Sequence, residues 1–395
     1  MQRVSIAARP DWQKKVEAQG LTFHSPAAMA PQPYWDESAC YKFSAAEIDT
    51  LEAVGSELQG MCLAAAQHVI DKQRYAELGI PANAAPVIEW AWNQDPPSIY
   101  GRFDILWAGA SAGSKWGATA PKLLEYNADT PTSLLEAAVV QGDWLDEVGR
   151  SLSANPDQFN TIHERLIERW QSVVDALIPP VYFAALDDPD EPEDLATTTY
   201  LRDTADQAGL HTEAISLQDI GWNPDRECFV DLEENQIFSI FKQYPWESML
   251  GEDFGPQALD TYADVRWIEP IWKLLLSNKG LLPILWELYP GHPLLLEAYF
   301  DEPRRMGSYV RKPIYSRDGA NVSIIRPNMR AIEMPGPYGD GRFICQSLAP
   351  EVVFAERHPV LGLWMIGEEC CGMGIRESAG LITDKLSSFV PHYFE

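Results

Sequence analysis

The sequence predicts a mixed α/β protein, and three observations support that fold class. The chain has 395 residues, of which 46% are hydrophobic and 22% charged, so it can bury large cores and divide into two or three lobes. A βαβ pattern runs from the apolar stretch 181–186 through a helical stretch to the strand-like stretch 212–217. Two strand patterns at 98–107 and 122–127, joined by a segment rich in Gly, Ala and Ser, predict a hairpin.

The remaining elements follow in order along the chain. Residues 1–85 are expected to be mainly helical, with apolar periodicity at 45–54 and 58–71, and further helices follow the hairpin to about residue 174. A second hairpin is expected at 226–242. We expect one domain over 1–395, with lobes at about 1–175, 176–260 and 261–395.

The acidic segment 187–194 follows the strand at 181–186, at the end where α/β folds place ligands. Its charge alone favours a solvated surface loop.

Four polar side chains are expected on one face of the first hairpin. Arg102 and Asp104 are two residues apart on one strand, and Glu125 and Asn127 are two apart on the other. Carboxylate and amide oxygens suit Mg²⁺, and an arginine beside them suits phosphate. The spacing alone favours an exposed polar face with an ion pair. After the second strand, Ser133 with Glu136 predicts a capping box that starts a helix.

The C-terminal third contains further cations. Lys279 lies in an apolar helical region, and Lys312 ends a strand at 309–313. A turn-rich loop at 315–321 then leads into a strand at 322–325, an arrangement that can fold over phosphates. Most such loops are simple turns. Gln346 and Arg376 lie on two later strand patterns and, taken singly, fit a paired strand amide and a surface arginine.

The net charge of −28 excludes nucleic acid as an expected partner, because 30 basic residues face 58 acidic ones. An acidic body could steer a cationic amine, or serve solubility alone. No apolar run is long enough for a transmembrane helix, and the N-terminus lacks a signal-peptide pattern. We therefore expect no membrane association. The six cysteines have no metal-binding spacing, so we expect buried free thiols and a reducing, cytoplasmic location.

Taken together and in order, these motifs resemble the synthetase domain of glutathionylspermidine synthetase and its stand-alone relatives, the acid–amine ligases. Those proteins are ATP-grasp enzymes, so the resemblance implies an ATP-grasp-type fold with the nucleotide bound between lobes. It covers most of the chain and rests on Arg102-Phe103-Asp104, Glu125-Tyr126-Asn127-Ala128-Asp129, Ser277-Asn278-Lys279, Lys312-Pro313-Ile314, Gly319-Ala320-Asn321, Gln346 and Arg376.

The resemblance also implies a role for each residue. Asp104, Glu125 and Asn127 would bind Mg²⁺, with Glu125 bridging two ions. Arg102 would be the catalytic residue that contacts ATP and stabilises the transferring phosphoryl group. The other nucleotide-pocket residues would be Asp104, Lys279, Lys312, Gly319 of the lid, Gln346, Arg376, Leu381, Ile382 and Thr383. Thr130 and Thr132 stand where the family favours hydroxyls for its acid substrate, although Pro131 separates them here.

The function that the resemblance implies is ATP- and Mg²⁺-dependent ligation of a peptide-like carboxylic acid to an amine, through an acyl phosphate, with accompanying ATPase activity. A polyamine is among the candidate amines. The alternative is a nucleotide-binding protein without ligase turnover, acting as an ATP-driven partner-binding switch. A third hypothesis is that the chain is a polyamine-binding module.

Three departures from the family bear on its substrates. No N-terminal amidase is expected, since Cys40 has no convincing His partner. A family acidic position falls on Ser388, and the 187–194 loop differs in length from its family counterpart. The identities of the acid and the amine, and the oligomeric state, do not follow from the sequence.

Overall fold

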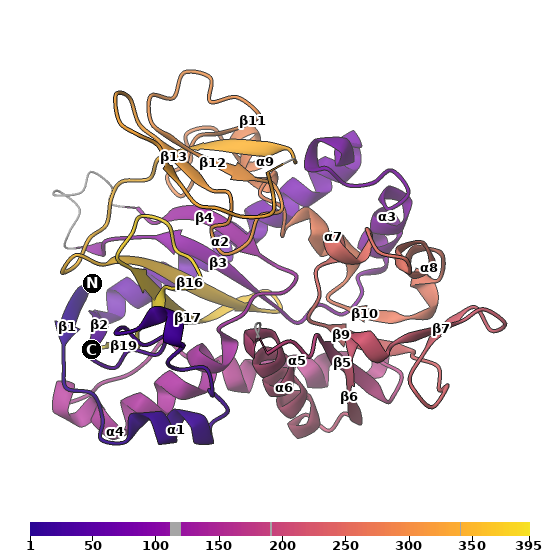
Figure 1. The fold of residues 1–395 in the computed structure, drawn as a ribbon, viewed down its shortest axis with the longest axis horizontal. Coiled ribbons are helices and arrows are strands. Elements are labelled where there is room, and N and C mark those ends of the chain that lie inside the picture. The colour runs from indigo at the N-terminus through magenta and orange to yellow at the C-terminus, as the bar shows by residue number, and fades with distance from the viewer. Residues whose placement is uncertain (111–119, 190–191, 340) are drawn as a thin grey trace.

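A five-stranded antiparallel sheet at the centre of the molecule carries the predicted hairpin (Figure 1). The computed structural model describes residues 1–110, 120–189, 192–339 and 341–395. In spatial order the strands are β18 (Ser388–Phe389), β17 (Glu369–Ser378), β16 (His358–Ile366), β3 (Tyr100–Leu106) and β4 (Lys122–Asn127). The pairing of β3 with β4 confirms the hairpin; part of its connection, 111–119, lies outside the described residues.

A second sheet is entirely parallel, with the order β10 (Arg266–Ile268), β9 (Ser239–Lys242), β5 (Val181–Ala185) and β6 (Thr212–Ser216). Every residue of β5 is buried, as expected for an apolar strand covered on both faces. Helix α6 (Pro192–Gln207) connects β5 to β6 and packs on both, so the predicted βαβ unit is confirmed.

The hairpin expected at 226–242 is only partly correct. The predicted turn does form, with an antiparallel bridge between Val230 and Gln236, but the regular antiparallel pair is β7 (Gly221–Asn223) with β8 (Cys228–Val230). The chain turns back after β8, where Ile237 N donates to Phe229 O at 2.9 Å, and then enters the parallel sheet as β9. All four residues of β9 are buried, and a central position between β5 and β10 meets that requirement better than an exposed hairpin would.

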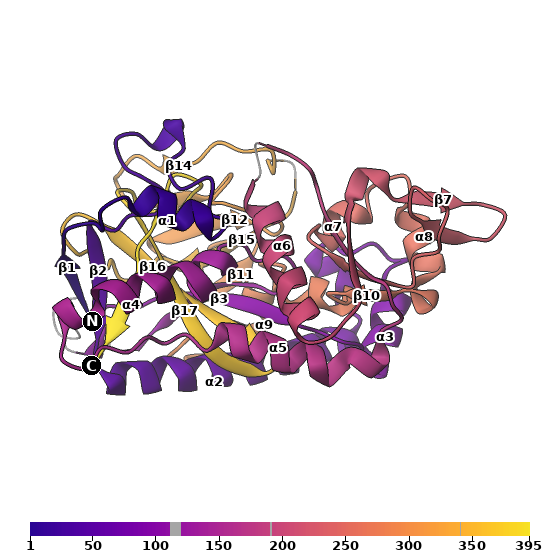
Figure 2. The ribbon, with the colours of Figure 1, turned by 90° about the horizontal axis from the view of Figure 1, so that it is seen from below.

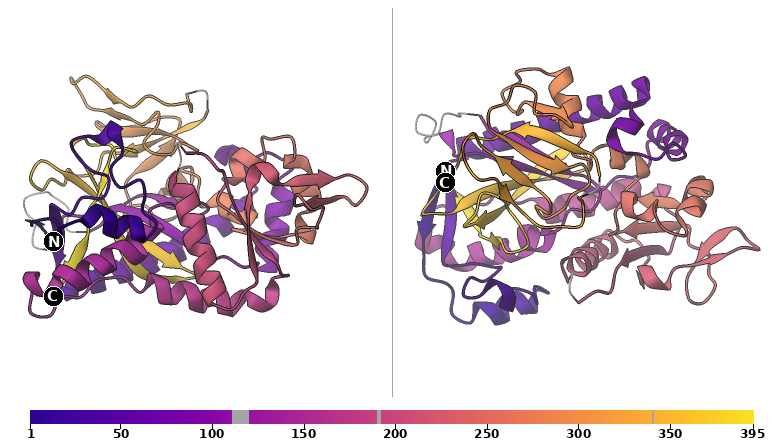
Figure 3. Two further views of the ribbon diagram at one scale, coloured as in Figure 1. Left: turned by 60° about the horizontal axis from the view of Figure 1, so that its bottom comes forward. Right: turned by 45° about the horizontal axis from the view of Figure 1, so that its top comes forward.

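A third, antiparallel sheet contains the lysine strand predicted at 309–313 (Figure 3). Its order is β11 (Ala298–Phe300), β15 (Phe343–Ser347), β12 (Tyr309–Pro313), β13 (Ser323–Ile325) and β14 (Ile332–Glu333). Helix α9 (Leu281–Leu288) packs against β11 and β15. The strands expected at 309–313, 322–325 and around Gln346 are all observed.

The two chain termini lie together, because β1 (Gln2–Ser5), β2 (Ala39–Phe43) and β19 (His392–Phe394) form one small sheet (Figure 2). The helices not yet named are α1 (Trp12–Ala18), α2 (Ala45–Lys72), α3 (Ala85–Gln94), α4 (Gln141–Leu152), α5 (Ile162–Val173), α7 (Trp246–Met249) and α8 (Gly255–Asp260).

Helix α2 joins the two periodic stretches of the N-terminal region into one long element below the central sheet (Figure 2). It starts with a complete capping box, in which Ser44 and Glu47 each accept a hydrogen bond from the other's backbone N–H. Its inward residues, among them Leu51, Leu58 and Cys62, have no exposed surface, and the helix packs against β16, β17 and α9. The apolar periodicity therefore predicted the buried face of this helix.

The helix predicted after Ser133 does begin at residue 134, where Ala137 N donates to Ser133 O at 3.3 Å, but among the described residues the capping box does not form. Ser133 has a φ of +67°, whereas an N-cap residue takes an extended backbone. Its hydroxyl lies 3.1 Å from the Tyr34 hydroxyl, which donates to Glu136 Oε1 at 2.6 Å. The segment that follows, Glu136–Val140, is a π-helical turn that leads into α4.

All six cysteines are buried free thiols, as the sequence predicts. Across the described ranges, no helix combines the length and apolar character needed to cross a bilayer.

Candidate active site

The register of the β3–β4 hairpin places the four predicted side chains together. Arg102 pairs with Asn127 and Asp104 with Glu125. Arg102 donates to both carboxylate oxygens of Asp104, from Nε at 2.6 Å and from Nη2 at 3.0 Å. Asn127 Nδ2 donates to Asp104 Oδ2 at 3.1 Å and lies 3.4 Å from Glu125 Oε1. The polar face expected from the spacing is present, and it is a connected network.

Two lysines from other segments join this face. Lys279, just before α9, lies 2.9 Å from Glu125 Oε2 and also donates to the backbone oxygen of Ser316. Lys312 donates to Leu124 O at 3.0 Å and to Gln346 Oε1 at 2.8 Å. Gln346 in turn donates from Nε2 to the backbone oxygen of residue 123 at 3.1 Å. Strand β4 is therefore where the predicted metal and phosphate residues meet.

The charges of this cluster are strongly coupled. Burial alone would raise the pKa of Glu125, but Lys279 and Lys312 outweigh it and lower that pKa to about 2. Burial raises the pKa of Asp104 above its usual value, even though Arg102 opposes the shift. Burial also lowers the pKa of Lys312 to about 8. The site therefore combines a carboxyl whose pKa is lowered, Glu125, with a lysine whose pKa is also lowered, Lys312.

The donor set of Asp104, Glu125 and Asn127 fits Mg²⁺ in chemical type, since it offers two carboxylates and one amide. Asn127 directs its amide nitrogen toward both carboxylates, so coordination through its oxygen would require the amide to rotate by half a turn. Within the described ranges, no three His, Cys, Asp or Glu side chains gather as a metal-binding group. The predicted trio contains only two such residues, so any metal here would also need the amide, water or phosphate oxygens.

Gly319 lies against the segment 381–383, which the sequence assigns to the same pocket. Its φ is +69°, and a Cβ added there would approach Ile382 Cγ2 to 2.7 Å and Thr383 O to 2.8 Å. Only glycine can adopt this positive φ and also leave Ile382 and Thr383 in place. Leu381 is half-buried at the start of the segment.

Arg376 on β17 is held by backbone carbonyls. Its Nη2 donates to Asp384 O at 2.8 Å and its Nε to Ser387 O at 3.2 Å. Its guanidinium carbon lies 5.4 Å from the centre of the Tyr34 ring. The Arg102 and Arg376 charges are close enough to affect each other's ionisation, which places Arg376 near the hairpin face.

Sequence reasoning missed two residues of the pocket, Arg317 and Glu247. Arg317 Nη1 donates to Thr130 Oγ1 at 2.7 Å, and its Nη2 donates to Glu247 Oε1 at 2.9 Å. The other oxygen of Glu247 is buried and has no hydrogen-bond partner within the described part of the chain. Thr132 contributes its backbone oxygen, which accepts from Arg102 Nη1 at 2.6 Å. Arg317 belongs to the predicted 315–321 loop, whereas nothing local in the sequence marks Glu247.

These side chains line a small polar pocket that joins the hairpin face. Its lining residues are Asn127, Thr130, Glu247, Ser277, Lys279, Tyr315, Ser316 and Arg317. Asp194, in the first turn of α6, approaches it from one side, because Gln243 Nε2 lies 3.3 Å from Thr130 O and 3.2 Å from Asp194 Oδ1. Residues 190–191 of the predicted acidic loop lie outside the described residues. Ser388 is buried and donates to Pro33 O at 2.7 Å.

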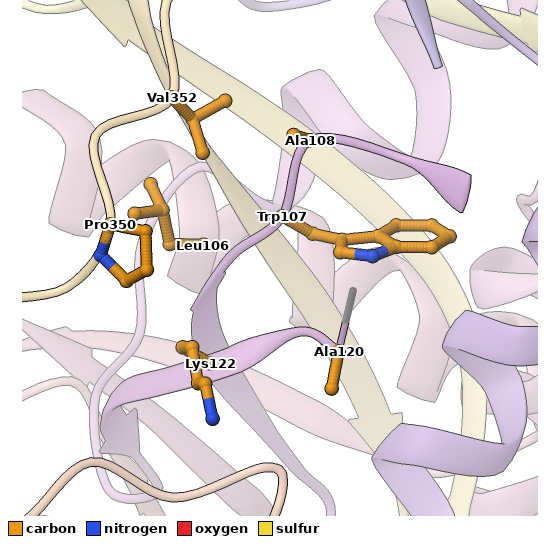
Figure 4. A pocket seen from close by; sticks show the side chains of 7 residues that line it. All are labelled: Leu106, Trp107, Ala108, Ala120, Lys122, Pro350 and Val352. Atoms are coloured by element: carbon orange, nitrogen blue, oxygen red, sulfur yellow. The ribbon is translucent and has the colours of Figure 1, made fainter. Parts of the chain in front are cut away.

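A second hollow lies at the opposite end of the hairpin (Figure 4). Its lining residues are Leu106, Trp107, Ala108, Ala120, Lys122, Pro350 and Val352. Among the described residues the lining is mostly apolar, with Lys122 as its one charged side chain. None of the predicted site residues lines it, so the polar pocket is the better candidate for chemistry.

Comparison with known proteins identifies the family. The family model described as "Glutathionylspermidine synthase preATP-grasp" matches residues 3–395. A protein of Haemophilus influenzae, described as "Putative acid--amine ligase", is 37% identical over the full length of both chains. Trypanothione synthetase of Crithidia fasciculata is 29% identical, over 85% of this chain and 54% of its own length. The bifunctional glutathionylspermidine synthetase/amidase of Escherichia coli is 25% identical, over 88% of this chain and 57% of its own.

A solved structure has a similar fold. The structure of a glutathione synthetase-like effector from Globodera pallida superposes with a TM-score of 0.57, covering 99% of this chain and 100% of its own. At 10% identity this similarity concerns the fold alone, and it supports the mixed α/β, ATP-grasp-type architecture. With the family model matching nearly every residue, the chain belongs to the glutathionylspermidine synthase preATP-grasp family.

Proposed function

We propose that this protein is an ATP- and Mg²⁺-dependent ligase that joins a peptide-like carboxylic acid to an amine through an acyl phosphate. The main support is that carboxylates, an amide and three cationic side chains gather around strand β4. Around β4 lie two carboxylates with an amide, two buried lysines and an arginine paired to Asp104. A site that only binds nucleotide has no need for all of them.

The cations account for nucleotide binding. Lys279 and Lys312 would contact the phosphates, and Arg376 would approach from β17. Gln346, Gly319 and the 381–383 segment would enclose the rest of the nucleotide. Mg²⁺, with two ions proposed, would be held by Asp104, Glu125 and Asn127 and would offset phosphate charge during transfer. Arg102 would stabilise the phosphoryl group as it moves to the substrate carboxylate.

The polar pocket is suited to the acid substrate. It adjoins Asn127 and Lys279, so a carboxylate there would lie beside the transferring phosphoryl group. Arg317 and Thr130 can bind an anionic or hydrogen-bond-accepting group. The unpaired oxygen of Glu247 needs a donor, which the N–H of a peptide-like acid would supply.

The amine would then attack the acyl phosphate. Asp194 lies next to the pocket through Gln243, and the net charge of −28 favours the approach of a cation. A polyamine is one such cation. The buried thiols also fit a reducing compartment such as the cytoplasm.

The experiment is a screen of ADP release and product mass with Mg²⁺, ATP, a panel of peptides and amino acids, and a panel of amines. Glutathione and spermidine are the first probes, because related synthetases carry their names. Arg102→Ala serves as the control for a catalytic role. The proposal predicts an amide product that disappears in this variant while ATP binding persists. Tight ATP binding with no product from any pair would instead favour the nucleotide-switch alternative.

A further inference from the structure

A fully buried ion pair joins the loop after β4 to the end of β9. Lys242 Nζ lies 2.8 Å from Asp129 Oδ1, and neither side chain has any exposed surface. The two residues are 113 positions apart, and they connect the central sheet to the parallel sheet. Neither charge takes part in the nucleotide or metal roles described above.

The remaining hydrogen bonds of this pair bring in further segments. The other carboxylate oxygen of Asp129 accepts from Trp246 N at 2.9 Å, and Lys242 Nζ donates to Tyr244 O at 2.9 Å. The lysine ammonium also lies 4.7 Å from the centre of the Trp246 ring. The backbone N–H of Asp129 donates to Ser277 Oγ at 2.7 Å, and that of the preceding residue does so at 3.0 Å.

The pair lies beside the polar pocket, because Asp129 and its partner Trp246 are each next to a lining residue and Ser277 lines the pocket itself. Thr130 follows Asp129, and Glu247 follows Trp246. Lys279 is two residues beyond Ser277. The pair therefore holds the walls of the pocket in one arrangement, although it does not line the pocket itself.

Stability alone does not account for this pair. Removing two charges from water costs several kcal/mol per ion, and apolar replacements of buried pairs are often neutral or stabilising. A buried pair is more useful where it fixes one geometry. We propose that Asp129 and Lys242 are positioning residues, which hold Thr130 and Glu247 in register with the phosphoryl-transfer face. The kinetic part of this inference rests on the ligase function proposed above; the geometric part does not.

The kinetic test compares Asp129→Asn, Lys242→Met and the double variant Asp129→Asn/Lys242→Met. Each single variant leaves a polar or charged group without its partner and should lower the melting temperature. The double variant removes both charges and should recover most of that loss. If the pair positions the pocket, the kcat of the double variant should stay about 10²-fold below wild type, as for a small misplacement of reacting groups. Its KM for ATP should stay within about threefold of wild type, since uniform nucleotide binding is retained.

The matched control is Glu37→Gln, which breaks another buried ion pair, Arg9–Glu37. Among the described residues, the hydrogen bonds of Arg9 and Glu37 reach none of the pocket-lining side chains. This variant should lower the melting temperature and leave kcat unchanged. A double Asp129/Lys242 variant that regains both stability and kcat would show that the pair is merely structural.

A geometric test needs no substrate. Cysteines introduced as Thr130→Cys and Glu247→Cys should be cross-linked rapidly by a short bis-maleimide, because Arg317 now bridges the two native side chains. The six native thiols are buried and should react slowly. Adding Asp129→Asn/Lys242→Met should slow the cross-linking about tenfold, as the walls lose their fixed spacing. An unchanged cross-linking rate would overturn the inference even if no acid or amine had been identified.

Discussion

Lys312 should make ATP binding depend on pH in a way that ordinary lysines do not. Burial lowers its pKa from the ordinary 10.5 to about 8 in the unliganded protein, even though Glu125 pulls in the opposite direction. A triphosphate beside the ammonium would raise that pKa again, because an adjacent anion favours the charged form. Binding above pH 8 should therefore take up a proton.

The sign and size follow from linkage. If ATP raises the pKa of Lys312, the affinity for ATP is at its full value below the unliganded pKa of about 8. The affinity then falls as the pH rises from that value toward the pKa of the bound state. At pH 9 about nine-tenths of the unliganded Lys312 would be neutral, against about one-tenth at pH 7. ATP affinity should then fall about tenfold between pH 7 and pH 9, which is about 1.4 kcal/mol.

The assay is isothermal titration calorimetry of MgATP at pH 7, 8 and 9, in buffers with different ionisation enthalpies. Wild type should take up about 0.9 proton at pH 9 and about 0.1 at pH 7. Lys312→Met should bind ATP weakly at every pH and lose this proton uptake. Lys14→Met, at an exposed lysine, should behave as wild type. Proton uptake near zero at pH 9 in wild type would refute the placement of Lys312 at the phosphates.

Three further predictions concern the same site. Glu125→Gln should lower Mg²⁺-dependent ATP turnover by about 10² or more, measured as ADP release across a Mg²⁺ titration, because it removes a proposed metal ligand and the partner of Lys279; wild-type Mg²⁺ dependence would exclude Glu125 as a ligand. Arg102→Lys should lower kcat by about 10² with little change in KM for ATP, since a lysine cannot reproduce the two-pronged contact of a guanidinium with the transferring phosphoryl group; a raised KM with unchanged kcat would assign Arg102 to ground-state binding. Gly319→Ala should raise the ratio of ATP hydrolysis to amide formed, because the added Cβ would clash with Ile382 and Thr383 and keep the 315–321 loop from closing over the nucleotide. An unchanged ratio would show that this loop does not exclude water from the site.

Local patterning predicted most of the elements that carry the site. The bounds of β4, β12 and β15 agree with the predicted strands, each of which combines apolar residues with the polar residues of the site. The common face of Arg102 and Asp104 needs only the two-residue period of a strand. That they meet Glu125 and Asn127 needs only an antiparallel hairpin.

The failures share one cause, which is contact between residues distant in sequence. The Ser133 capping box was excluded by Tyr34, 99 positions away, whose hydroxyl reaches both Ser133 and Glu136. Strand β9 pairs with β5 and β10 and not within a hairpin, because its four residues are buried in the parallel sheet. Arg317 donates a hydrogen bond to Glu247, 70 positions away, and no local periodicity in the sequence predicts such a contact.

The unliganded site is self-neutralised, and this bears on how it accepts anions in so acidic a protein. Arg102 is paired with Asp104, Lys279 with Glu125 and Arg317 with Glu247. A triphosphate that attracts Arg102 and Lys279 would draw them from their carboxylates, and the freed carboxylates would then favour a divalent cation. The phosphates would thus replace the carboxylates as partners of Arg102 and Lys279, and Mg²⁺ would replace these two cations as the partner of the carboxylates. By linkage, the factor by which Mg²⁺ raises affinity for the nucleotide must equal the factor by which the nucleotide raises affinity for Mg²⁺. Breaking one internal pair should shrink both factors together, since the pairs are what couples the two sites.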